Sequence, residues 1–367
     1  MFAKKTLVAA AALLAVAGAA QAQSSVKLYG YIEASVGSFE DFNFVDGTTD
    51  RATKVESGNM MTSFIGLSGS EDLGGGLKAE FVLESFLAGD TGATLNNMAG
   101  GFWGRGSWVG LSGDFGRVAL GQYDNAFFTM GLLYNPFGSS MTFSPTMVSY
   151  YSLAGFQAAS LGYDTGWVNS ITYETPNLGG FTASLQFAPK ESSTGADAKN
   201  SYAVSAAYNA GALSVMAVYT SSGQNLVSGS LQPYPRHQKN FGLGASYDFG
   251  VAKLSAQYSQ VKDETAGADQ KSKFFQVGAT VPVTANGNVM VSYGQTKYED
   301  GFLGLADGKL QQFSLGTREG LALMCLAEAL LRVPDEDTRD RLIAEKIGSA
   351  DWAAHLGQSD SLFVNAS

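Results

Sequence analysis

The stretch Lys253–Val261, KLSAQYSQV, alternates between two kinds of side chain. Leu254, Ala256 and Tyr258 fall on one side of an extended chain, and lysine, serine and glutamine side chains fall between them on the other. Period two is the spacing of a β-strand, because successive side chains of a strand point to opposite faces of the sheet. The same period recurs in residues 181–187 and 200–208. The sequence therefore predicts an all-β protein.

About thirteen strands are expected before residue 300, or fourteen if the irregular segment 150–163 counts as a strand. The expected strands lie near residues 26–36, 62–70, 77–86, 105–112, 117–121, 150–163, 169–175, 181–188, 201–208, 212–220, 239–248, 252–261, 273–281 and 288–298. Short turns, such as Asn209–Gly211, alternate with long loops at 37–61, 122–149 and 221–238. Short turns at one end and long loops at the other are typical of a membrane β-barrel.

A water-soluble sandwich also alternates, but its outward face is normally charged. Here the polar faces carry Ser, Thr, Gln and Gly, and Tyr and Phe gather near the strand ends. Lipid offers no partner for backbone N–H and C=O groups, so a sheet in a membrane has to close on itself. These features favour a transmembrane antiparallel β-barrel over a soluble sandwich.

Composition excludes several other classes. The chain has 367 residues and 45 glycines, 15% of its residues are charged, and its net charge is −10. That balance excludes a charge-driven disordered chain and disfavours binding to nucleic acid.

The N-terminus has Lys4 and Lys5, an apolar run at 7–20 and the small-x-small sequence Ala20-Gln21-Ala22. Residues 1–22 are predicted to be a cleaved signal peptide. The alternative, an uncleaved membrane anchor, conflicts with a run shorter than the ~20 residues that a spanning helix needs.

Four stretches, in order, resemble the Gram-negative general porins of the betaproteobacterial type. They read SSVKLYGYIEASVG (24–37), TSFIGLSGSEDLGGGLKAEFVLES (62–85), SWVGLSGDFGRVALGQ (107–122) and ITYETPNLGGFTASLQF (171–187). The resemblance covers residues 1–316. It implies a homotrimer of sixteen-stranded, water-filled channels in the outer membrane, in contact with its lipid and passing ions and small hydrophilic solutes.

The long loop 122–149 is the expected constriction. Long loops in compact domains are usually functional or disordered, and this one is rich in aromatic residues. The resemblance implies that it folds into the barrel and narrows it, with a Pro-acid-Phe-Gly turn whose place is taken here by Asn135-Pro136-Phe137-Gly138. Asp124 is the only acidic residue of the loop. The alternative is a surface loop packed on its own side chains.

Charges on the opposite wall would complete a field across the pore. Strand parity predicts that Lys27, Glu33, Lys78, Glu80 and Arg117 face the lumen, and Arg105 is expected to begin the fourth strand. For each of these, a position at the membrane interface or in a loop is the alternative. Gln122 stands where relatives often have Arg, which weakens the expected basic cluster. With a net charge of −8 over residues 23–316, a weak preference for cations is expected.

The sequence predicts neither an enzyme nor a cofactor or metal site. The two histidines, His237 and His355, lie far apart, and no HExxH, GxSxG or CxxC motif occurs. The glycines at 74–76 lie in an expected hairpin turn, and not between a strand and a helix as a phosphate-binding loop requires.

Composition changes near residue 316. All 16 tyrosines come before this point, and Cys325, the sole cysteine, comes after it. From Thr317, a plausible helix N-cap, apolar residues recur at helical spacing, and a second helix is expected over 335–347. The sequence REGLALMCLAEALLRVPDEDTRDRLIAEKI (318–347) resembles the region just ahead of the proline dehydrogenase barrel in the bifunctional flavoenzyme proline utilisation A. The resemblance covers 318–367 and includes none of that family's flavin-binding or substrate residues.

The expected organisation is therefore a signal peptide (1–22), a porin barrel truncated to about 13–14 strands (23–316) and a foreign, short α-helical extension (317–367). The strand at Leu310–Leu315 would supply about six residues, fewer than the ~9–11 that a membrane strand requires. A porin would continue with further strands and end in Phe, whereas this chain ends in Asn-Ala-Ser. The alternative function is therefore a non-functional chimera, or a fragment of the proline dehydrogenase family without catalytic residues.

Overall fold

The computed structural model describes residues 25–42, 49–94, 101–152, 165–190, 198–223, 237–264, 270–284, 287–299 and 308–319. The chain divides into two compact units, residues 1–318 and residues 319–367. Every described residue except Glu319 belongs to the first unit. The predicted signal peptide and the predicted helix over 335–347 lie outside the described residues. No helix in the described part of the chain is long and apolar enough to cross a membrane.

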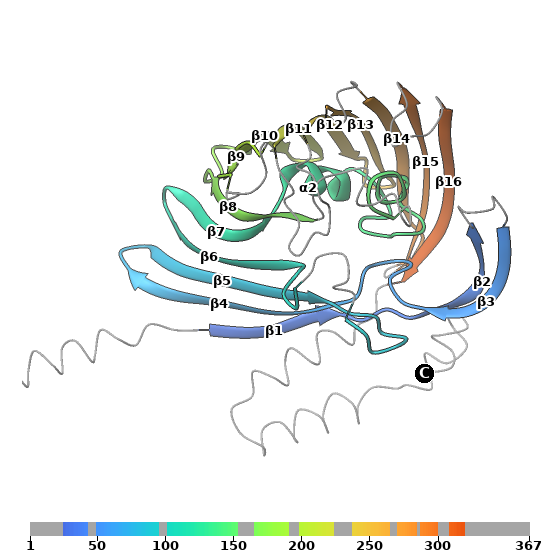
Figure 1. The fold of residues 1–367 in the computed structure, drawn as a ribbon, viewed down its shortest axis with the longest axis horizontal. Helices are drawn as coiled ribbons and strands as arrows, with labels where there is room; N and C mark the ends of the chain where they lie inside the picture. Colours follow the sequence, from blue (N-terminus) through green and yellow to red (C-terminus); the bar gives the residue numbers. More distant parts are fainter. Residues whose placement is uncertain are drawn as a thin grey trace, which may run out of the picture. The chain divides into compact units, whose positions relative to one another are not determined.

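One large sheet dominates the first unit (Figure 1). It has 14 strands in chain order, and neighbouring strands from β1 to β15 pair antiparallel. Its strands are β1 (Ser25–Tyr31), β4 (Phe64–Gly74), β5 (Leu77–Phe86), β6 (Gly106–Gly113), β7 (Gly116–Asp124), β8 (Gly166–Glu174), β9 (Phe181–Ala188), β10 (Ser201–Ala210), β11 (Leu213–Ser222), β12 (Gln238–Asp248), β13 (Lys253–Asp263), β14 (Gln270–Pro282), β15 (Gly287–Glu299) and β16 (Gly308–Glu319). The predicted all-β, antiparallel fold is confirmed.

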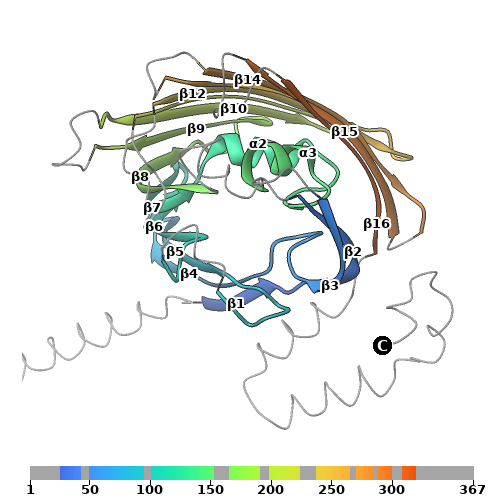
Figure 2. The ribbon, with the colours of Figure 1, turned by 45° about the vertical axis from the view of Figure 1, so that its right-hand side comes forward.

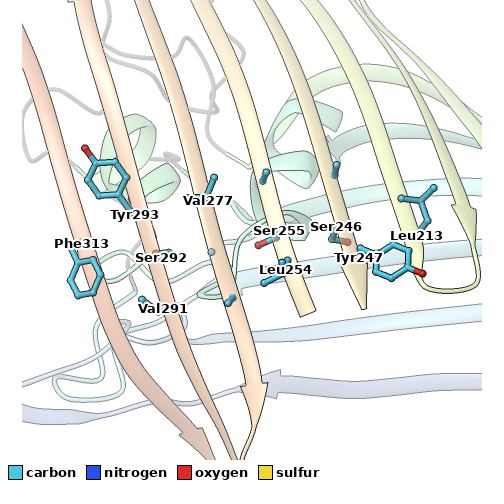
Figure 3. A pocket seen from close by; sticks show the side chains of 14 residues that line it. Leu213, Ser246, Tyr247, Leu254, Ser255, Val277, Val291, Ser292, Tyr293 and Phe313 are labelled. Carbon is cyan, nitrogen blue, oxygen red and sulfur yellow. The ribbon is translucent and has the colours of Figure 1, made fainter. Parts of the chain in front are cut away.

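The two faces of this sheet have opposite chemistry. In β12, Asn240 and Ser246 are buried on the concave face, while Phe241, Leu243 and Tyr247 alternate with them and are 41–46% exposed on the convex face. Figure 3 shows the convex side of β11–β16, where apolar and aromatic side chains line a groove of about 550 Å³. Polar residues inside and apolar residues outside reverse the pattern of a water-soluble protein and suit a sheet surrounded by lipid.

The concave face holds the segment between β7 and β8. This segment forms α2 (Ala126–Leu133), α3 (Pro145–Met147) and the π-helical turn η1 (Val148–Ser152), and Figure 2 shows the sheet curving round it. The expected loop 122–149 is thus largely folded, and its first three residues extend β7. The strand expected at 150–163 is wrong at its start, because residues 150–152 belong to η1. Its remainder lies outside the described residues.

The main apolar core lies between this segment and the concave face. Phe127, Phe128, Met130 and Tyr150 of the segment are each at most 3% exposed, and they pack in one cluster with Phe274 of β14. The buried residues of this cluster are therefore supplied equally by the two sides, seven by the segment and seven by the strands.

A second, two-stranded sheet replaces most of the long loop expected at 37–61. It pairs β2 (Ser35–Phe42) with β3 (Thr49–Glu56). The strand expected at 26–36 is interrupted, because β1 ends at Tyr31 and β2 begins at Ser35. Met60, just beyond β3, lies close to Gly316 of β16, so this hairpin reaches the far end of the large sheet (Figure 2).

The last strand is longer than expected. β16 has 12 residues, which meets the ~9–11 that a membrane strand requires. Thr317 lies in this strand, so its predicted role as a helix N-cap is wrong. Among the described strands, β1 and β16 are the ends of the sheet and are not hydrogen-bonded to each other. The 14 strands of the large sheet agree with the 13–14 predicted, and β2 and β3 are two further strands that were not predicted.

Glycines on the concave face make room for the inner segment, and this gives a first prediction. A Cβ on Gly244 would overlap the ring of Tyr134. We expect Gly244→Val to lower the free energy of unfolding by about 1–3 kcal/mol, because the packed interface cannot absorb the added volume. Urea unfolding in detergent micelles measures the change. Ala245→Val, one residue along on the convex face, is the matched control, and an equal loss in both variants would contradict the prediction.

Candidate functional site

Asn125 fixes the start of the inner segment. Its side-chain Oδ1 accepts a hydrogen bond from the N–H of Phe127, which caps the N-terminus of α2, at 2.9 Å. Its Nδ2 donates to Oε1 of Gln186 on β9 at 2.8 Å, and the side chain is fully buried. One residue therefore both begins the helix and joins it to the wall.

Further polar contacts hold the segment along its length. Tyr134 Oη bonds Ser214 Oγ of β11 at 2.9 Å, and Tyr150 Oη bonds Ser259 Oγ of β13 at 2.9 Å. Thr146 Oγ1 donates to Oε1 of Gln276 of β14 at 2.6 Å. Burial raises the pKa of Tyr134, although the bond to Ser214 opposes the shift. The serines and glutamines that alternate along the strands are thus the groups that bind the inner segment.

The turn Asn135-Pro136-Phe137-Gly138 follows α2 and is closed by its own asparagine. Asn135 Oδ1 accepts from the N–H of Phe137 at 2.8 Å, and its Nδ2 donates to the carbonyl of Gly138 at 3.2 Å. Phe137 is 4% exposed and stacks on Phe143 with ring centroids 5.8 Å apart. Gly138 has φ +49°, a conformation that glycine adopts without strain. Asparagine here supplies a donor and an acceptor where an acidic residue supplies acceptors alone.

A cavity of about 600 Å³ lies between α2 and the wall formed by β1 and β5–β11. Its charged lining residues are all acidic: Glu84 of β5, Asp124 of β7 and Glu174 of β8. Tyr29 and Trp108 also line it, and the Trp108 ring lies 5.1 Å from that of Tyr123. The described lining includes no Lys or Arg side chain.

The two predicted arginines pair with carboxylates of this wall. Arg117 donates from Nε to Glu80 at 2.9 Å and from Nη1 to Glu174 at 3.0 Å, so one guanidinium joins two carboxylates. Arg105 precedes β6 and does not begin it; its Nε lies 2.9 Å from Glu84 Oε2, and its Cζ lies 4.3 Å from the centroid of the Phe64 ring. Tyr29 Oη donates to the other oxygen of Glu84 at 2.5 Å.

The remaining predicted residues lie away from this cavity. Lys27 and Lys78 are exposed residues of β1 and β5 and do not line it. Glu33 lies between β1 and β2, where the alternation of a strand does not apply. Its Oε2 accepts the N–H groups of Gly58 and Asn59, the latter at 3.0 Å, so it ties down the segment after β3.

The sequence analysis missed Glu84 and Glu174. Both have a signal in the sequence: Glu84 shares the parity of Lys78 and Glu80, and Glu174 is the last residue but one of the strand expected at 169–175. Thr172, 3% exposed, was also missed, because a threonine in a strand carries no signal of its own. No group of three metal-ligating side chains lies together in the described residues.

Comparison with known proteins identifies the family. A family model described as Gram-negative porin matches residues 9–318. The chain belongs to this family. Outer membrane porin protein 32 of Delftia acidovorans is 37% identical over 322 residues, covering 85% of this chain and 84% of that protein. The solved structure of the anion-selective porin from Comamonas acidovorans is 32% identical with a TM-score of 0.67, covering 82% of this chain and 85% of that one. The porin resemblance is confirmed, and the protein is an outer-membrane protein of the porin fold.

A second match covers the end of the chain. The DNA-binding domain of proline dehydrogenase matches residues 305–367. The bifunctional protein PutA of Escherichia coli (strain K12) is 59% identical over 70 residues, which is 19% of this chain and 5% of that protein. This match confirms the second resemblance but begins at 305, ahead of the expected 318, so both families match residues 305–318. The expectation that this chain binds no nucleic acid stays a prediction.

The double role of Asn125 gives a second prediction. We expect Asn125→Ala to lower the free energy of unfolding by about 2–3 kcal/mol, because it removes a helix cap and leaves the buried Gln186 amide short of a partner. Tryptophan fluorescence during urea unfolding measures the loss. Asn200 is exposed and also accepts a backbone N–H, from Lys190, so Asn200→Ala is the control and should cost less than about 1 kcal/mol. A loss at Asn125 no larger than in this control would argue against the dual role.

Proposed function

We propose that this porin is a general diffusion channel, in which ions and small hydrophilic solutes cross the outer membrane through a water-filled lumen narrowed by residues 122–149. The observation that carries the proposal is the attachment of this segment to the concave face. Tyr134, Thr146 and Tyr150 all bond to strand side chains there. A segment anchored on the inner wall takes up cross-section and leaves the remaining lumen polar.

The charges of the wall support a preference for cations. Around the cavity, four carboxylates (Glu80, Glu84, Asp124 and Glu174) face two guanidiniums (Arg105 and Arg117), which leaves a net charge of −2. A narrow, low-dielectric passage of one sign concentrates ions of the opposite sign. The relative from Comamonas acidovorans is anion-selective. This wall supports the opposite preference for the present chain.

Ion preference is the third prediction. In a planar lipid bilayer with a KCl gradient, we expect a reversal potential that corresponds to a permeability ratio of K⁺ over Cl⁻ above one. Glu174→Gln should lower the ratio, because it removes a charge that lines the cavity. Glu71, an exposed residue of β4 outside this cavity, provides the control variant Glu71→Gln, which should leave the ratio unchanged. A preference for anions in the unmodified protein would overturn the proposed selectivity.

We extend the proposal to assembly as a homotrimer in outer-membrane lipid. An apolar groove of about 530 Å³ on the wall of β1 and β4–β7, lined by Val26, Phe81 and Val109 among others, supports it. A small residue in the same groove, Ala79, allows a neighbouring barrel to approach closely.

A second candidate, a chain that does not assemble into a working channel, is favoured by one observation. Among the described strands, β1 and β16 do not pair with each other. Unpaired strand edges in lipid cost several kcal/mol for each exposed backbone group.

Assembly is the fourth prediction. Under the proposed function, the unheated protein in detergent should run on a denaturing gel at the size of a trimer and fall to monomer size on boiling. The stability of a closed, fully paired barrel is the physical reason for resistance to detergent. Migration as a monomer both before and after boiling would favour the second candidate.

A further inference from the structure

We propose that the tip of the inner segment, residues 137–143, bridges the two ends of the large sheet, and that Asn59 is the residue that positions this tip. One side of the bridge lies at Asn59, just ahead of β4, and the other lies at Gln312 of β16. The bridge is inferred from contacts among the described residues. Its effect on ion current alone rests on the proposed function, so the inference and the proposed function can fail separately.

Asn59 is 8% exposed, and each of its four polar groups has a hydrogen-bond partner. Its N–H donates to Oε2 of Glu33 at 3.0 Å, and its Nδ2 donates to Oε2 of Glu56 at 3.2 Å. Glu33 lies between β1 and β2, and Glu56 is the last residue of β3. Asn59 is therefore held by the first strands of the chain independently of its contacts with the inner segment.

The two oxygens of Asn59 hold the tip. Its carbonyl oxygen accepts a hydrogen bond from Ser140 Oγ, and its Oδ1 accepts one from Thr142 Oγ1, both at 2.5 Å. Ser140 Oγ also accepts the backbone N–H groups of Thr142 and Phe143, at 3.3 and 2.8 Å. The turn that contacts Asn59 is thus closed by its own serine. Two bonds to neighbouring parts of a closed turn fix its orientation as well as its position.

The other side of the tip contacts β16. Gln312 Nε2 donates to the carbonyl oxygen of Thr142 at 2.8 Å. Gly316 lies on the same face of β16 as Gln312, because the two are an even number of residues apart. A Cβ on Gly316 would lie 3.1 Å from the Phe137 ring and 3.8 Å from Met60 Cε. The missing side chain of this glycine therefore lets the tip and the segment after β3 meet at β16.

Thr142 joins the two sides of the bridge. Its hydroxyl bonds Asn59, and its carbonyl bonds Gln312. Among the described strands, β1 and β16 are not hydrogen-bonded to each other, so no ladder sets the distance between them. The tip, inside the curve of the sheet, sets this distance through side chains instead (Figure 2). The position of the constriction and the position of the sheet ends therefore depend on the same contacts.

The experiment measures the distance between the two ends by double electron–electron resonance on the full chain in detergent. Spin labels are attached at Leu28→Cys of β1 and Leu315→Cys of β16, which are 47% and 62% exposed. The parent chain carries Cys325→Ser, which removes the native thiol. Dilution with unlabelled protein restricts the signal to distances within one chain. We expect a single narrow distance distribution.

A threonine series tests the bridge. Thr142→Val removes the hydroxyl that bonds Asn59 and nearly keeps the shape of the side chain. We expect it to broaden the distribution about twofold, because the sheet ends then move independently of each other. Thr142→Ser returns the hydroxyl and should restore the narrow distribution. Thr129→Val is the matched control, because the Thr129 hydroxyl donates to the segment's own backbone at Asn125. It should leave the distribution unchanged.

A second pair of labels separates movement of the sheet ends from general loosening. Leu185→Cys of β9 and Leu254→Cys of β13 lie on strands that are paired on both sides, and Thr142→Val should not change the distance distribution between them. Gln312→Met removes the donor on the β16 side and keeps the length of the side chain. It should broaden the distribution between the sheet ends as Thr142→Val does.

The same variants test the constriction in a planar lipid bilayer. Thr142→Val should raise the noise of the open-channel current about twofold, because the tip is less firmly held, and Thr142→Ser should not. A narrow distribution in Thr142→Val, a broad one in the parent chain, or equal broadening of both label pairs would overturn the inference even if the protein conducts ions. Broadening confined to the sheet ends in a protein without conductance would support the inference and overturn the proposed function.

Discussion

A strand inside lipid has one source of partners for its backbone N–H and C=O groups, which is the neighbouring strand. This constraint explains the long antiparallel sheet, in which each strand from β4 to β15 is paired on both sides. It also makes the ends of the sheet the decisive places. At β1 and β16 the same groups need partners from outside the large sheet, and the hairpin of β2 and β3, with Met60 close to Gly316, lies in that region.

The inner segment depends on the same arrangement. Most apolar residues of the strands lie on the lipid-facing surface, so the concave face offers mainly small and polar side chains, with a few apolar ones such as Trp167, Val261 and Phe274. The segment therefore brings its own aromatic and methionine residues and joins the wall through hydroxyl and amide groups, as Tyr150 does with Ser259. Glycines such as Gly244 let its aromatic rings approach the strand backbone. The position of the inner segment thus depends on hydrogen bonds and on glycines in the wall as much as on the burial of apolar side chains.

The sequence was sufficient for the class of fold and for the strands whose alternation is regular, such as β12 and β13. It failed where a local feature overrides periodicity. The expected first strand is interrupted between Tyr31 and Ser35, so Glu33 does not lie on the wall. The chain then forms β2 and β3 where a long loop was expected. At the site, strand parity predicted the face of the sheet on which Glu80 lies, but it did not predict that Glu80 pairs with Arg117. The pairing of Arg117 with both Glu80 and Glu174 depends on which strands are neighbours and in which register.

The last strand of the sheet shows that the family to which a stretch of sequence is related does not by itself determine its local conformation. Residues 305–318 match two families at once, and β16 occupies most of them. What this stretch supplies is period two: Phe313 and Leu315 lie 62–68% exposed, while Ser314 is buried between them. Gln312 then donates to the carbonyl of Thr142 at 2.8 Å, so the last strand is attached to the inner segment as the other strands are. Alternation and one inward amide are enough to extend the sheet. They supply no hydrogen-bond partner for the backbone at the outer edge of β16. Closure of the barrel therefore depends on what pairs with this edge, and not on the composition of the strand.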